Sequence, residues 1–309
     1  MKHDLYVLAG ATATGKTSVA NQLARGLGAV ILSADAMLVY QGMDIGTAKP
    51  APRERSGLAY GGIDCVTPDQ GFSVGQYLET ALEFLRALPE QQPVVVVGGT
   101  GLYIKALLAG LDTMPPVDPA LRRDIDQLYE QGGLAALQAA CQKEAPERYA
   151  ALKDPANPRR LSRALELARM GVPMQDAWQR KVTGRCTVLA RERSSLNQRI
   201  ETRVHNMYDA GLVAEVESLL QRWPTWSKTA TMAIGYREAR ALLAGEMTES
   251  EAKAETARRT RQYARRQQTW FRHQLPQDEI AVTETDTLEH IAERVAQSWR
   301  KYGPCKLAQ

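Results

Sequence analysis

The stretch Gly10-Ala11-Thr12-Ala13-Thr14-Gly15-Lys16-Thr17 fits the pattern G-x-x-x-x-G-K-[ST] of a phosphate-binding loop, or P-loop. It follows an apolar segment, Leu5 to Ala9, that predicts a strand, and it opens a predicted helix from Ser18 to Leu27. Glycines let the backbone curl so that its N–H groups face phosphate oxygens, and the helix adds its positive end. The stretch therefore predicts an α/β fold that holds a diphosphate or a triphosphate.

Two residues of the loop carry further chemistry. Lys16 supplies a mobile positive charge to the terminal phosphates, and the Thr17 hydroxyl can bind a Mg²⁺ ion. We therefore expect every residue from Gly10 to Thr17 to contact the phosphates of the ligand, with Thr17 as the metal ligand.

Two more apolar segments, Ala29 to Leu32 and Pro93 to Val97, predict strands of a parallel sheet that is covered on both faces. Asp35 and Thr100 follow these segments, at the edge of the sheet where ligands bind in open α/β folds. From position alone, each could instead be a helix cap. Val97 is not followed by an acidic residue, which argues against a motor ATPase or a GTPase.

Composition places the chain among soluble globular proteins. It has 309 residues, of which 44% are hydrophobic and 24% charged, and no apolar run reaches the ~18 residues of a membrane helix. The P-loop begins too early for a signal peptide to precede it, so we expect a cytoplasmic protein without membrane contact, and a monomer. The four cysteines are far apart and predict free thiols.

After Leu111 the sequence pattern changes from strands alternating with helices to helices alone. Helical patterns cover about 119–131, 134–143 and 158–170, and no strand is indicated before Cys186. We expect a P-loop NTPase-like catalytic core from residues 1–111 and 185–309, with basic carboxy-terminal helices, and an inserted all-helical domain at 112–184. Three arginines within residues 159–163 are either a solvated face or a clamp for backbone phosphates.

Basic residues concentrate downstream. Residues 1–110 carry 8 basic and 9 acidic residues, against 31 and 26 in the rest of the chain. A helix predicted from a capping box at Thr248 and Glu251 runs to about residue 273 and is rich in arginine. Nucleic acid phosphates are its natural partner, and the alternative is a surface helix that pairs with acids elsewhere.

Three classes of protein use a P-loop in this way. A small-molecule kinase would hold ATP there and leave the helical insertion and the arginine-rich helix unexplained. The absence of an acidic residue after Val97 argues against a nucleotide-dependent binding protein. A transferase whose donor carries a diphosphate leaving group uses every feature, provided that its acceptor is a nucleic acid.

The chain resembles the tRNA dimethylallyltransferases, which prenylate the adenosine on the 3′ side of the anticodon. The resemblance covers nearly the whole chain. It is carried by the P-loop, Asp35 with Val39-Tyr40, Gly42 to Pro50, Gly98 to Tyr103, Asn157 to Glu166, Ala233 to Glu238, and Tyr263 to Arg272. Ala36, Leu38 and Met232 depart from residues that are frequent in that family.

The resemblance implies a Mg²⁺-dependent transfer of a dimethylallyl group from dimethylallyl diphosphate to N6 of that adenosine in the anticodon stem-loop of tRNA. It implies that Lys16 and the P-loop hold the donor, that Asp35 is the general base, and that Thr100 hydrogen-bonds near the reacting groups. The residues implied to contact tRNA are Asp35, Ala36, Met37, Leu38, Thr100, Arg122, Arg159, Arg160, Leu161, Ser162, Arg163, Met232, Ala233, Ile234, Gly235, Tyr236 and Arg237.

Overall fold

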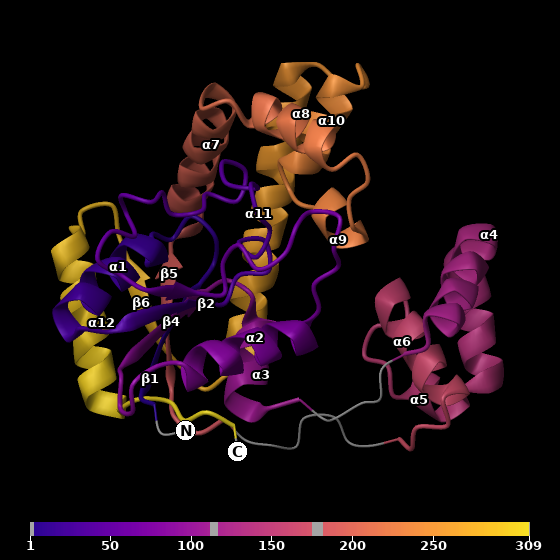
Figure 1. Cartoon of the computed structure of the whole chain (residues 1–309), viewed down its shortest axis with the longest axis horizontal. Coiled ribbons are helices and arrows are strands. Elements are labelled where there is room, and N and C mark those ends of the chain that lie inside the picture. Colours follow the sequence, from indigo (N-terminus) through magenta and orange to yellow (C-terminus); the bar gives the residue numbers. More distant parts are fainter. Residues whose placement is uncertain (1–2, 112–116, 175–181, 309) are drawn as a thin grey trace. The chain divides into compact units, whose positions relative to one another are not determined.

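The structure is a computed structural model that describes residues 3–111, 117–174 and 182–308. The chain forms two compact units. Residues 1–111 and 180–309 make the core unit, and residues 112–179 make the inserted unit. Both are drawn in Figure 1.

The core unit is built on a six-stranded sheet in the order β3-β2-β4-β1-β5-β6, and every neighbouring pair is parallel. The strands are β1 (Leu5–Gly10), β2 (Val30–Ser33), β3 (Tyr60–Gly61), β4 (Val94–Gly98), β5 (Cys186–Arg191) and β6 (Gln277–Val282). Because all carboxyl ends share one edge, the loops that follow β1, β2 and β4 lie beside one another there. This edge carries the candidate site.

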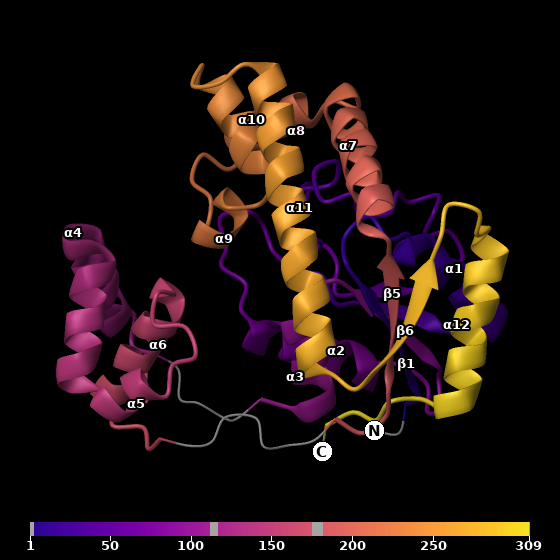
Figure 2. The ribbon, with the colours of Figure 1, turned by 180° about the vertical axis from the view of Figure 1, so that it is seen from behind.

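Helices cover both faces of the sheet, as the front and rear views show (Figures 1 and 2). On one face α1 (Lys16–Leu27) and α12 (Leu288–Tyr302) cover a cluster that includes Leu8, Ile31 and Val95. On the other face α2 (Val74–Arg86), α3 (Gly101–Ala109) and the long α11 (Glu249–Gln274) cover the alternate strand residues. This alternation is the period of two that a strand imposes on its side chains.

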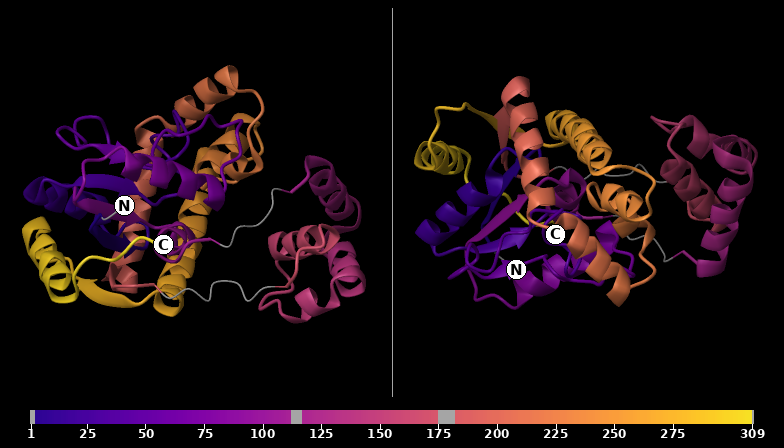
Figure 3. Two further views of the ribbon diagram at one scale, coloured as in Figure 1. Left: turned by 60° about the horizontal axis from the view of Figure 1, so that its bottom comes forward. Right: turned by 90° about the horizontal axis from the view of Figure 1, so that it is seen from above.

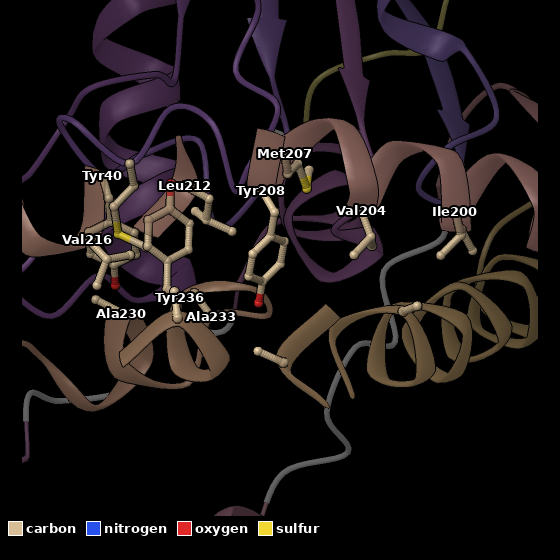
Figure 4. Packing of buried hydrophobic residues seen from close by; sticks show 14 of the residues in the cluster. Tyr40, Ile200, Val204, Met207, Tyr208, Leu212, Val216, Ala230, Ala233 and Tyr236 are labelled. Carbon is tan, nitrogen blue, oxygen red and sulfur yellow. The ribbon is translucent and has the colours of Figure 1, made fainter. Parts of the chain in front are cut away.

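A second core lies beyond the carboxyl ends of the strands (Figures 1 and 3). It is formed by α7 (Arg193–Asp209), α8 (Leu212–Arg222), α9 (Lys228–Thr231), α10 (Tyr236–Leu243) and the first part of α11, together with the loop around Tyr40 and Met43. Figure 4 shows Tyr40, Leu212, Val216 and Tyr236 packed together in this cluster.

Helices are the regular secondary structure among the described residues of the inserted unit. It consists of α4 (Pro119–Glu144), α5 (Pro146–Ala150) and α6 (Pro158–Arg169), with a small core of its own around Ile125, Leu137 and Leu165. Gly133, with φ 62° and ψ −157°, kinks α4 where the sequence predicts the end of one helix and the start of the next.

The predicted fold class, a parallel α/β sheet flanked by helices with a helical insertion, is confirmed. Sequence reasoning missed β6 and α12. The strand begins Gln277-Asp278-Glu279, and such a polar start hides an edge strand from a search for apolar runs. Among the described residues, the helices that are long enough to cross a membrane are too polar to do so.

Candidate active site

The P-loop follows β1, and two of its side chains donate hydrogen bonds to its own backbone. Thr14 Oγ1 donates to the Ala11 carbonyl at 2.9 Å, and Lys16 Nζ donates to the same oxygen at 3.1 Å. Gly10 is required because a Cβ there would lie 2.8 Å from the Leu189 carbonyl oxygen of β5. Gly15, with φ 93°, turns the chain into α1. The loop therefore presents its remaining N–H groups and the helix end to an anion.

Lys16 is held in a desolvated position. Burial lowers its pKa from 10.5 to about 8, although the nearby Asp35 carboxylate raises that pKa and Arg203 lowers it. The pKa of Arg203 is likewise lowered by burial and raised by Asp35. Two cations and one carboxylate from three distant segments therefore lie within electrostatic reach of one another.

Of these three groups, Lys16 and Arg203 line a cavity of about 1040 Å³ within the core unit. The helix α7 contributes Arg199 and Arg203, four residues apart on one face. Arg199 Nε also donates to the Ala13 carbonyl of the P-loop at 2.9 Å. Sequence reasoning missed both arginines, although their spacing on a helix that follows β5 was a usable signal.

The loop from Gly42 to Pro50 forms another wall of this cavity. Lys49 is almost fully buried, with its Nζ 2.6 Å from carboxylate oxygens of both Asp44 and Asp64. Thr47 Oγ1 donates to the Met43 carbonyl at 2.6 Å. Both side chains therefore hold the loop together.

Tyr236 and Glu215 clamp the same loop from the helical side. Glu215 accepts hydrogen bonds from the Ile45 N–H at 2.9 Å and from the Tyr236 hydroxyl at 2.5 Å, and burial raises the pKa of Glu215. The Tyr236 ring lies in the helical core shown in Figure 4. A Cβ on Gly46 would overlap this ring, so the loop packs directly on the tyrosine.

Asp35 lies just past β2, at the expected sheet edge. One of its carboxylate oxygens accepts the Met37 N–H at 2.9 Å, and within residues 3–111, 117–174 and 182–308 no hydrogen bond to the other oxygen is found. Thr100 Oγ1 accepts the Ala36 N–H at 2.9 Å, so the turn after β4 is tied to the turn after β2. Burial raises the pKa of Tyr103, and the Asp35 charge raises it further. The structure thus brings Asp35, Thr100 and Lys16 to one place.

Comparison with known proteins identifies the family of this chain. The sequence model of the IPP transferase family matches residues 38–274. The chain belongs to this family. A tRNA dimethylallyltransferase of Thermus thermophilus is 41% identical over 272 residues, which cover 87% of this chain and 89% of that protein. Another, from Azoarcus sp., is 36% identical over 299 residues and covers 92% of this chain and 93% of its own length.

Solved structures agree with the family. The tRNA isopentenylpyrophosphate transferase of Bacillus halodurans superposes with a TM-score of 0.70 at 32% identity, covering 97% of this chain and 98% of that one. A eukaryotic dimethylallyltransferase, solved acting on tRNA, has the same fold, with a TM-score of 0.76 at 21% identity over 96% of this chain and 78% of its own. The family predicted from the sequence is confirmed, and the small-molecule kinase is not favoured.

The residues expected to contact tRNA differ in exposure in this IPP transferase. Within the segment 232–237, Met232 and Arg237 are exposed and Ile234 is half-buried, whereas Ala233, Gly235 and Tyr236 are buried. The Tyr236 side chain packs in the helical core, so its contacts are with the protein. Ala36, Met37 and Leu38 are half-buried beside Asp35.

In the inserted unit, two of the arginines expected to contact tRNA pair with one buried acid. Glu166 is 6% exposed and pairs with Arg122 Nε at 3.1 Å and with Arg163 Nη1 at 3.0 Å. Arg159 and Arg160 are exposed on the first turn of α6, Ser162 is half-buried, and Leu161 points into the core of the unit. The side chain of Leu161 is therefore a packing residue.

The arginine-rich helix α11 is partly neutralised. Arg258 pairs with Glu255, Arg259 with the buried Glu238, and Arg261 with Glu201 on α7. For Arg259 and Arg261, pairing with acids elsewhere describes the structure better than a free basic face, whereas Arg258 pairs within α11 itself. Among the described residues, no carboxylate pairs with Arg265.

Thr17 is the candidate magnesium ligand in this family member. Across the described residues, no group of three or more His, Cys, Asp or Glu side chains could hold a metal ion. Thr17, at the start of α1, lines the cavity beside Lys16. Mg²⁺ keeps several waters and takes its other ligands from substrate phosphates, so one hydroxyl facing a diphosphate site fits it.

Proposed function

We propose that this protein transfers a dimethylallyl group from dimethylallyl diphosphate to N6 of the adenosine that follows the anticodon of tRNA, giving N6-isopentenyladenosine. The observation that carries the proposal is the convergence of Lys16 and Arg203 with the Asp35 carboxylate at the carboxyl edge of the sheet. Positive charges that can stabilise the departing diphosphate thus lie beside a carboxylate that can take the proton from the acceptor amine.

The donor diphosphate would occupy the 1040 Å³ cavity. Ala13, Gly15, Lys16 and Thr17 line this cavity at the start of α1, and Lys16 and Arg203 offer positive charge. An allylic diphosphate ionises readily once its leaving group is neutralised, so fixed donors aimed at that group supply much of the catalysis. Thr17 would hold a Mg²⁺ ion, which adds positive charge to the same leaving group.

Asp35 would accept the proton from the exocyclic amine of the adenine. That amine is a poor nucleophile because its lone pair is spread into the ring, so a base is useful. A positioned base typically contributes ~10²–10⁴-fold to the rate. Thr100, whose hydroxyl receives the Ala36 N–H, lies next to this carboxylate and would hydrogen-bond near the reacting groups.

The acceptor base must leave its stack to reach Asp35, and the bases of a single-stranded loop are the most readily splayed out. The anticodon stem-loop would be held by exposed cations, with Arg159 and Arg160 from the inserted unit and Arg237 from the core unit as candidates. We also propose a monomeric enzyme, and a cytoplasmic one because its substrate is tRNA.

The test is an incubation with unmodified tRNA, Mg²⁺ and either dimethylallyl diphosphate or ATP. Nuclease digestion and mass spectrometry should find prenylated adenosine only with the prenyl donor. Asp35→Asn in the same assay controls for uncatalysed transfer. ATP turnover on a small acceptor, with no prenyl transfer, would overturn the proposal.

A further inference from the structure

Gln267 joins the two loops of the site. It lies on α11, is 5% exposed, and uses both ends of its amide. Its Oε1 accepts the Thr12 N–H of the P-loop at 2.9 Å, and its Nε2 donates to the Gly99 carbonyl at 2.8 Å. Because β1 and β4 are neighbours in the sheet, the two loops lie side by side, and one side chain spans them.

The turn from Gly99 to Gly101 packs closely against the Gln267 amide and its helix. A Cβ on Gly99 would overlap Gln267 Nε2, and a Cβ on Gly101 would overlap the ring of Trp270, one turn further along α11. The turn from Gly99 to Gly101 therefore rests directly on the helix. A shift of α11 along its axis would carry this turn, and with it Thr100.

A neighbouring hydroxyl extends the connection to the base. Tyr263, one turn before Gln267, lies within hydrogen-bonding reach of the side chains of both Gln267 and Thr100. Thr100 in turn receives the Ala36 N–H beside Asp35. These contacts connect Thr12 of the P-loop, through α11, to the residue that follows Asp35.

We propose that Gln267 is a positioning residue that keeps the donor-binding P-loop and the turn carrying Thr100 in register with Asp35. The proposal rests on the proposed function. Its consequence is that loss of the amide slows the transfer step more than it weakens donor or tRNA binding. A displacement of about 1 Å between reacting groups can lower a rate ~10²-fold.

Two variants test this in the full-length protein. Gln267→Met keeps the length and removes both hydrogen bonds, and Gln262→Met, at an exposed position of the same helix, is the matched control. We expect Gln267→Met to lower the single-turnover rate by ~10–10²-fold with saturating tRNA and donor, while both dissociation constants change less than about threefold. The control should match the wild type.

Gln267→Glu supplies a pH signature and covers a failure of the first variant to fold. Its carboxylate would face the Gly99 carbonyl, and repulsion should displace the turn. A protonated glutamic acid can donate to Gly99 and accept from Thr12 as the amide does, and burial favours that form. The rate relative to wild type should therefore recover as pH falls from about 8 to about 5.5.

A wild-type single-turnover rate in Gln267→Met, with only a lowered melting temperature, would make Gln267 a structural tie and overturn the proposal. So would a loss confined to the donor dissociation constant, or a relative rate of Gln267→Glu that ignores pH. A wild-type protein that fails to prenylate tRNA in the same experiment would overturn the proposed function instead, and this proposal with it.

Discussion

Lys16→Met is expected to stabilise the ligand-free protein while it destroys donor binding. Burial lowers the pKa of Lys16 from 10.5 to about 8, so the charged amine is less stable in the folded protein than in the unfolded chain. At 1.36 kcal/mol per pKa unit, this difference corresponds to roughly 3 kcal/mol of unfolding free energy. Methionine has a similar length and no charge, so the variant should regain most of it.

The sign of the shift fixes the pH window. Because the folded pKa lies below the unfolded value, the unfolded chain binds more protons between about pH 8 and pH 10.5, and the wild type gains stability there as pH rises. Below about pH 8 the amine is charged in both states, and the full penalty is present. The advantage of Lys16→Met should therefore be largest near neutral pH and shrink above pH 8.

Urea unfolding of wild type, Lys16→Met and Lys16→Arg at about pH 7 and about pH 9.5 measures this. The arginine variant keeps its charge throughout and serves as the control. Donor titrations on the wild type should show weaker binding above pH 8, as the amine loses its proton. Equal stability of Lys16→Met and wild type at neutral pH, or an advantage that persists unchanged at the higher pH, would refute the reasoning.

Three further outcomes are expected. Asp35→Asn should keep near-normal tRNA and donor binding but lower the single-turnover transfer rate by at least ~10²-fold, and a rate close to wild type would make Asp35 a structural cap. Gly101→Ala should lower the unfolding free energy by about 1–3 kcal/mol, because its Cβ would overlap Trp270, and chemical denaturation checks this. Arg265→Gln should reduce the slope of log K for tRNA against log salt by ~0.7–0.9. Arg258→Gln, the control, loses a cation that is already paired with Glu255 and should change this slope less. Equal slopes for the two variants would contradict the distinction.

Local pattern was enough to predict the parts of the site that lie in one stretch of chain. The P-loop follows from the spacing of Gly10, Gly15 and Lys16 between a strand and a helix, and Asp35 from its place after an apolar strand. Both predictions need only neighbouring residues and the rule that parallel strands end at one edge.

Contacts between distant segments could not be predicted from the sequence. Lys49 looks like a free cation in the sequence, yet Asp64 and Asp44 neutralise it once the loop folds. Arg259 belongs to a run of arginines, yet it forms an ion pair with Glu238 on another helix. Whether a charge faces solvent or an acid depends on partners that no periodicity reveals.

The hydrogen bond between Thr12 and Gln267 joins residues 255 positions apart, and this separation has a consequence for synthesis. At the usual 5–20 residues per second, the ribosome needs roughly 13–50 s after making the P-loop to deliver its partner on α11. The central strand β1 also pairs with β5 and, at Leu5, with Cys305, and both partners are synthesised after it. An interrupted nascent chain would thus contain the whole phosphate-binding motif and yet lack a finished reaction centre.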